Sequence, residues 1–161
     1  MGLTGQSGSG PSTYSVGLHN VGSYQVSAVP WISGSGLNHG EGAEAALPKG
    51  HEFKFEFPMV TKTITVINQS AQDIRVHFNS TSSTLARPNA QPIGGINVIS
   101  GSHYLLMDSK EDSYTFNVKT TELYISAPET NSGDASFTII AELTQINLAR
   151  MFALSGSGLT E

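Results

Sequence analysis

The feature that most constrains this chain is an alternation of apolar and polar side chains that begins at residue 51. In the stretch HEFKFEF, three phenylalanines fall on one side of an extended backbone, and the charged residues between them fall on the other. A period of two is typical of a strand that buries one of its faces. No stretch predicts an amphipathic helix of three turns, so the sequence predicts an all-β protein.

Several further stretches are rich in Val, Ile, Thr and aromatic residues, which favour strands, and turn residues separate them. These stretches are 60–67, 74–78, 96–99, 103–107, 114–118, 122–126 and 137–143. A long polar loop with prolines and glycines, residues 79–95, interrupts the series. Short strands at this spacing predict an antiparallel β-sandwich or a jelly-roll-like domain.

The remaining sequence divides the chain into three parts. Residues 1–50 predict an extended N-terminal arm with Gly/Ser joints, residues 51–146 the β-sandwich, and residues 147–161 a short C-terminal strap or helical turn. The tetrapeptide Ser-Gly-Ser-Gly occurs three times outside the predicted sandwich, at 7–10, 33–36 and 155–158. Such joints let an arm leave the domain at any angle.

Apolar and aromatic residues beside these joints are the candidate interface residues. Ordering a Gly/Ser-rich segment costs about 1–2 kcal/mol per residue in backbone entropy, so we expect a neighbouring subunit to hold these segments. The candidates are Tyr14, Tyr24, Val26, Trp31, Ile32, Met151, Phe152 and Leu154. Trp31, the only tryptophan, has a second interpretation as a plug that seals one end of the sandwich.

Composition restricts the class of protein. A formal net charge of −5 with only 8 Lys and Arg argues against nucleic-acid binding, and no apolar run is long enough for a membrane helix. The N-terminal sequence does not predict a signal peptide, so we expect synthesis in a cytoplasm. The charged fraction is 13%, about half of the roughly 25% in an average domain. Either neighbours cover a neutral surface, or this is a secreted β-domain rich in Ser and Thr.

The sequence predicts no enzyme, no cofactor and no metal site. Without cysteine, thiolate zinc sites and cysteine nucleophiles are excluded. His77 alternates with Arg75, which predicts an exposed polar face rather than a metal ligand. The turn 108–112 carries three carboxylates but lacks EF-hand spacing, which favours a solvated turn.

Paired carboxylates for glycoside hydrolysis remain a formal alternative, because such partners meet only in the fold. The strand acids Glu56, Glu122 and Glu142 alternate with core positions, which indicates outward-facing residues. A metal or hydrolase site would need His77 and His103 to converge with an acid. The sequons at Asn68 and Asn79 would be glycosylation sites only in a secreted chain.

Longer segments resemble small β-sandwich structural proteins of tailed-bacteriophage particles, with capsid decoration (cement) proteins as the nearest type. These segments are VGLHNVGSYQVSAVPWISGSG, FPMVTKTITVIN, IRVHF, HYLLMDSKEDSYTFNVKTTELYIS, AELTQI and RMFALSGSGLTE. The resemblance spans most of the chain and includes no catalytic signature.

This resemblance implies a non-enzymatic virion protein, assembled in the host cytoplasm. It would bind the major capsid protein or other virion proteins, as a trimer or dimer, and stabilise the shell through arm exchange and surface packing. The alternative is a tail, neck or fibre component with a carbohydrate- or receptor-binding sandwich. For glycan binding, Tyr104, Tyr114 and Tyr124 would have to be exposed together.

Overall fold

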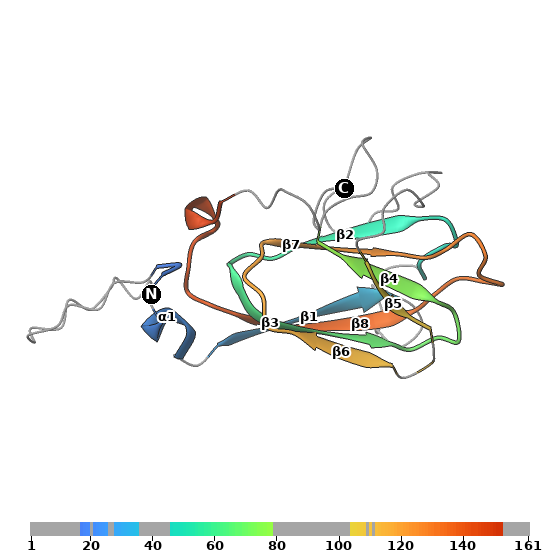
Figure 1. The fold of residues 1–161 in the computed structure, drawn as a ribbon, viewed down its shortest axis with the longest axis horizontal. Helices are drawn as coiled ribbons and strands as arrows, with labels where there is room; N and C mark the ends of the chain where they lie inside the picture. The colour runs from blue at the N-terminus through green and yellow to red at the C-terminus, as the bar shows by residue number, and fades with distance from the viewer. Residues whose placement is uncertain are drawn as a thin grey trace, which may run out of the picture.

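The structure, a computed structural model, describes residues 17–19, 21–25, 28–35, 46–78, 104–108, 110 and 112–152. Within them the chain forms two packed antiparallel sheets, with short helical turns at one end (Figure 1). The predicted all-β sandwich is confirmed.

The first sheet has the strand order β1-β8-β3-β6, and the second has the order β2-β7-β4-β5. Every connection passes from one sheet to the other except β4 to β5, so the topology is that of an eight-stranded jelly roll. The strands are β1 Val29–Ser35, β2 Glu52–Glu56, β3 Thr61–Asn68, β4 Ile74–His77, β5 Leu105–Met107, β6 Ser113–Phe116, β7 Glu122–Ser126 and β8 Phe137–Leu143.

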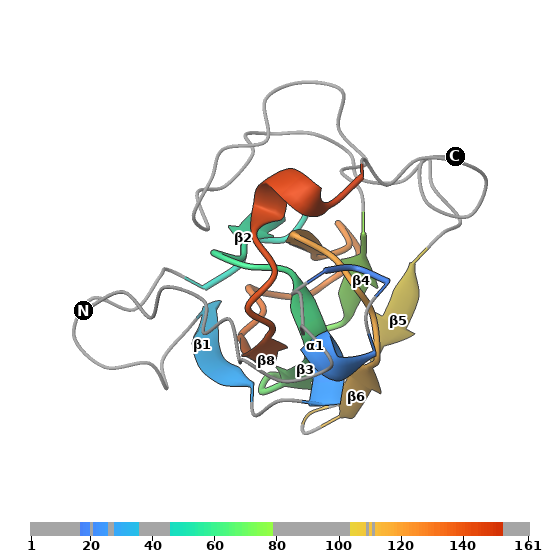
Figure 2. The same cartoon turned by 90° about the vertical axis from the view of Figure 1, so that its left-hand side faces the viewer.

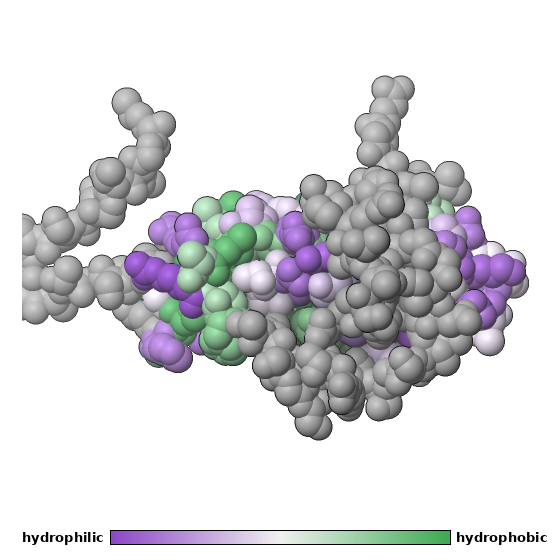
Figure 3. Space-filling model, turned by 90° about the horizontal axis from the view of Figure 1, so that it is seen from above, coloured by the Kyte–Doolittle hydropathy of each residue, from purple (hydrophilic) through white to green (hydrophobic). Residues whose placement is uncertain are grey.

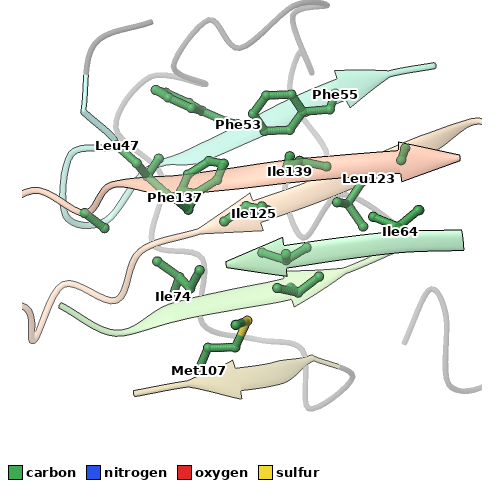
Figure 4. Close-up of a cluster of buried hydrophobic side chains, with 14 of the residues drawn as sticks. Leu47, Phe53, Phe55, Ile64, Ile74, Met107, Leu123, Ile125, Phe137 and Ile139 are labelled. Atoms are coloured by element: carbon green, nitrogen blue, oxygen red, sulfur yellow. The ribbon is translucent and has the colours of Figure 1, made fainter. Parts of the chain in front are cut away.

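Alternation in the sequence accounts for the main core. Along β8, Phe137, Ile139, Ala141 and Leu143 are buried and face the second sheet, whereas Ile140 and Glu142 are exposed. Figure 4 shows Phe137 and Ile139 among the apolar side chains of β2, β3, β4 and β7. The three phenylalanines of HEFKFEF are also buried, as their spacing predicts.

Strand β1 lies where the sequence predicts part of an external arm. It pairs with β8 over seven residues, from Val29 opposite Leu143 to Ser35 opposite Phe137. Three residues of the second Ser-Gly-Ser-Gly, residues 33–35, are therefore strand rather than a free joint. The alternation of apolar and polar residues is weak in β1, because the inward positions after Trp31 are occupied by serines instead of apolar residues.

A second, smaller core closes one end of the sandwich. Leu18, Val60 and Ile146 are buried together, and Tyr24 and Met151 pack against them partly buried. Two helical turns lie at this end, α1 Gly22–Gln25 and the 3₁₀ turn η1 Leu148–Arg150 (Figure 2). Of the two alternatives for the residues after 147, an extended strap or a helical turn, the described part contains a short 3₁₀ turn.

The described parts of residues 1–50 and 147–161 contact the sandwich of their own chain. Leu47 is fully buried in the main core and forms a β-bridge with Ala135. Tyr24 donates a hydrogen bond from its hydroxyl to the Leu18 carbonyl (3.1 Å), and Lys119 Nζ lies 4.3 Å from the centre of its ring. Both segments thus supply packing to the domain itself.

Candidate interaction surface

The outer face of the first sheet carries few charged side chains. The residues of this face point away from the core, and together they form what we call the docking face. They are Pro30, Ile32, Gly34, Thr63, Thr65, Ile67, Ser113, Thr115, Thr138, Ile140 and Glu142. Glu142 is the one charged residue among them, and it pairs with the neighbouring Lys62 at 3.6 Å.

An apolar pair lies on the docking face, on the edge strand β1 and its neighbour β8. Ile32 of β1 stands opposite Ile140 of β8, and these side chains are 65% and 39% exposed. Thr65 and Thr115 continue the same row across β3 and β6, and their hydroxyl oxygens are 2.8 Å apart. Because threonine satisfies its hydroxyls locally here, this row costs little to remove from water.

Strand β1 also borders the docking face at the edge of the sheet. Among the strands that the structure describes, β1 pairs with β8 alone. Its sequence, VPWISGS, has no charged residue, although edge strands usually carry charges that discourage pairing. Pro30 lacks an N–H group, so it is the one residue of this strand that cannot donate a backbone hydrogen bond to a neighbouring strand. The edge and the apolar pair together make this side of the molecule suited to association.

The predicted interface residues have different environments. Ile32 belongs to the docking face, and Phe152 is 62% exposed beyond η1. Tyr24 and Met151 pack in the second core, whereas Trp31 packs against the main core with its ring 4.9 Å from that of Phe57. The remaining candidates, Tyr14, Val26 and Leu154, lie outside the described residues.

The prediction that His77 lies on an exposed polar face is wrong, because its side chain is buried. His77 does point to the outer side of the second sheet, but it is only 3% exposed. It stacks on Tyr124, which is 4% exposed, and lies in a buried polar group with Glu52 and Ser126. Alternation identifies the face of a strand, but it contains no information on what covers that face.

This buried group does not have the geometry of a catalytic triad. His77 Nε2 is 3.0 Å from Ser126 Oγ and 3.8 Å from the Glu52 carboxylate. A Ser-His-acid relay needs the serine and the acid on different ring nitrogens, whereas here both face the same one. His103, which a metal or hydrolase site would also require, lies outside the described residues. Within the described ranges, no group of three His, Cys, Asp or Glu side chains could hold a metal ion.

The three tyrosines of the glycan alternative do not share a face. Tyr124 is buried, Tyr114 belongs to the first sheet, and Tyr104 precedes β5 of the second sheet. Tyr104 lies over Arg75, and Tyr114 packs 4.7 Å from Phe116. These rings cannot stack together on one sugar.

Three charged side chains of the second sheet, Lys54, Glu56 and Glu122, form a triad of ion pairs. The sequence predicts them only as separate, outward-facing residues. Lys54 Nζ is 2.8 Å from both Glu56 and Glu122, which stand opposite each other in the β2–β7 register. Tyr124 donates its hydroxyl hydrogen to Glu122 at 2.7 Å. Burial of Tyr124, and then this bond to Glu122, raise the pKa of the phenol far above its usual value.

The same triad shifts the pKa of Glu122. Burial opposes its ionisation, but hydrogen bonds from Lys54 and Tyr124 and the charge of Lys54 outweigh burial, so the pKa falls below its ordinary value of 4.5. A carboxylate with a lowered pKa in the folded state stabilises the protein above its unfolded pKa. This stabilisation is lost as pH falls through the folded pKa, which places the pH-sensitive window below 4.5.

We therefore expect Glu122→Gln to reduce the acid sensitivity of folding. Between about pH 6 and about pH 3, the variant should lose less unfolding free energy than the wild type. Urea unfolding followed by Trp31 fluorescence measures both values. Glu142→Gln, which removes an exposed carboxylate from the other sheet, is the matched control and should keep the wild-type pH dependence. Equal pH dependence in the Glu122 variant and the wild type would contradict the role of the triad.

No protein-family model matches this chain, and comparison with curated proteins and with solved structures finds no match to its sequence or fold. None of the helices in the described ranges is long and apolar enough to cross a membrane.

Proposed function

We propose that this chain is a non-catalytic structural protein of a tailed-bacteriophage particle, which binds the shell through its docking face. The observation that carries the proposal is the exposed apolar pair Ile32 and Ile140, which lies next to the edge of β1 that no described strand pairs with, on a sheet face with one carboxylate. Fully burying an exposed aliphatic side chain of this size contributes about 1.5–3 kcal/mol. Ile32 and Ile140 are 65% and 39% exposed, so covering them would supply part of that energy at an interface.

The topology supports the same proposal. Jelly rolls form viral capsid proteins, and they also form lectins and cupins, so the fold alone does not choose between these functions. A lectin is less favoured because the tyrosines do not gather, and the described residues offer no metal-binding group of the cupin kind. The low charged fraction, 13%, agrees with a surface that neighbours cover.

Within the particle, the head is the proposed location, with the major capsid protein as partner. Copies of the chain would occupy the shell as trimers or dimers, and the edge of β1 lies where a strand from a neighbour would extend the sheet. Contacts of this kind would resist the internal pressure of packaged DNA. The net charge of −5 suits a position away from the genome.

Co-sedimentation with particles of the source phage tests the proposal. The wild-type protein should sediment with intact heads, and the double variant Ile32→Lys/Ile140→Lys should bind at least about tenfold more weakly because two cations would enter an apolar interface. Val21→Lys is the matched control, since Val21 is 69% exposed and lies outside the docking face. Its binding should equal that of the wild type.

Three outcomes would reject parts of the proposal. Absence of the wild-type protein from every particle fraction would reject a virion role. Sedimentation with isolated tails but not heads would assign it to the tail instead. Equal binding of the double variant and the wild type would show that another surface makes the contact.

A further inference from the structure

A pocket of about 430 Å³ lies at one end of the second sheet, whereas the docking face belongs to the first sheet. It is bounded by the end of β2, the start of β7 and the segment that carries η1. Apolar walls come from Phe57, Leu148, Met151 and Phe152. Its volume falls within the range of about 300–1,000 Å³ that is usual for ligand sites.

Two carboxylates form the polar wall of this pocket. Glu56 and Glu122 stand opposite each other, and their side chains are 42% and 38% exposed. Lys54 binds both of them, which leaves the triad with a net charge of −1. Each carboxylate oxygen has two lone pairs, so both groups keep acceptor capacity after binding Lys54.

The apolar walls restrict which cation would fit. Leu148 is 40% exposed and Phe152 is 62% exposed, so an occupant with an apolar stem would remove both from water. Figure 3 shows green, hydrophobic surface beside purple, hydrophilic residues at the end of the molecule that carries η1. A small hydrated cation would leave this apolar surface uncovered.

We propose that the pocket receives an arginine side chain of a partner protein. A guanidinium is planar, binds a carboxylate with two parallel hydrogen bonds, and stacks on an aromatic ring such as that of Phe152. Lysine suits the pocket less well because its ammonium is a point charge that neither forms two parallel hydrogen bonds to a carboxylate nor stacks on the Phe152 ring. A protein-borne arginine also brings backbone that covers the exposed apolar rim.

Titration of the labelled full chain with the blocked tripeptide acetyl-Gly-Arg-Gly-amide, followed by NMR chemical shifts, tests the pocket directly. Shifts should concentrate at the end of β2, at the start of β7 and at residues 148–152, with a Kd of about 1 mM. The same peptide with citrulline, which keeps the shape but not the charge, should bind at least about tenfold more weakly. The lysine peptide should also bind more weakly.

Matched variants separate the pocket from general attraction to an acidic protein. Glu56→Gln should weaken arginine-peptide binding about tenfold, and Phe152→Ala should weaken it several-fold. Both side chains are partly exposed, and thermal unfolding confirms that each variant folds. Glu142→Gln removes an equal charge from the other sheet and should leave binding unchanged.

The proposal is overturned if shifts scatter over the acidic surface or if citrulline binds as well as arginine. Equal binding of the lysine peptide would show that the pocket reads charge alone, which contradicts the assignment to arginine. Equal weakening by Glu56→Gln and Glu142→Gln would likewise reject it. Because the pocket and the docking face belong to different sheets, failure here leaves the shell-binding test unaffected.

Discussion

Trp31→Ala should destabilise the isolated protein by about 2–3 kcal/mol, which is less than full deletion of a buried tryptophan costs because the side chain is only partly buried. The ring contacts Phe57 edge-on at 4.9 Å and packs against the main core. Its removal would leave a cavity between β1 and the second sheet. The unfolding free energy is measured by urea titration followed by far-ultraviolet circular dichroism, since the variant lacks the only tryptophan.

Ile32→Ala is the control, because the neighbouring residue on the same strand points to the opposite side. Ile32 is 65% exposed, so its truncation should change the unfolding free energy by less than about 0.5 kcal/mol. A small loss for Trp31→Ala, comparable to that of Ile32→Ala, would contradict the packing of β1 on the core. It would favour the interpretation of Trp31 as an anchor for a neighbouring subunit.

The strands with strong alternation could be predicted from the sequence. In β2 and β8 the inward positions are Phe, Ile, Leu or Ala, and the outward positions carry Lys, Glu or Thr with the single exception of Ile140, so the pattern specifies both the element and its buried face. The turn after β3 and the helical turn after Asn147 also follow from local chemistry. Asn147 caps η1 by accepting a hydrogen bond from the Ala149 N–H.

Strand β1 and the pocket could not be predicted in the same way. The inward positions of β1 after Trp31 are Ser33 and Ser35, whose lack of apolar surface hides the period. Ser35 is nevertheless fully buried, because pairing with β8 places it there. Glu56 and Glu122 meet only through the β2–β7 register, which depends on tertiary pairing and not on local sequence.

The two faces of the sandwich differ in a way that composition does not reveal. The first sheet presents threonines and isoleucines outward, whereas the second presents Lys54, Glu56 and Glu122 near a pocket and buries His77 beside Glu52. One chain therefore offers a broad neutral face and a small acidic pocket on opposite sides. This arrangement suits a component that contacts two neighbours with different chemistry.

Asn68→Ala should lower the unfolding free energy by about 2–4 kcal/mol, although the residue lies at the end of a strand beside a turn. Asn68 is fully buried, so the sequon that begins there is inaccessible to a glycan in the folded protein. Its amide nitrogen donates to the carbonyls of Gln72 (2.8 Å) and Met107 (3.4 Å). Its side-chain oxygen Oδ1 accepts hydrogen bonds from the Ser70 N–H and hydroxyl, both at 3.0 Å.

These bonds join the turn after β3 to the end of β5 across the two sheets, so alanine would leave several polar groups without their partners in a buried site. Ser70→Ala is the graded control, because it removes hydroxyl bonds but keeps the backbone bond to Asn68, and it should cost about 1 kcal/mol. Urea unfolding followed by Trp31 fluorescence measures both variants. Equal losses for the two would mean that the bonds to Gln72 and Met107 add nothing, and that packing alone holds the turn against the second sheet.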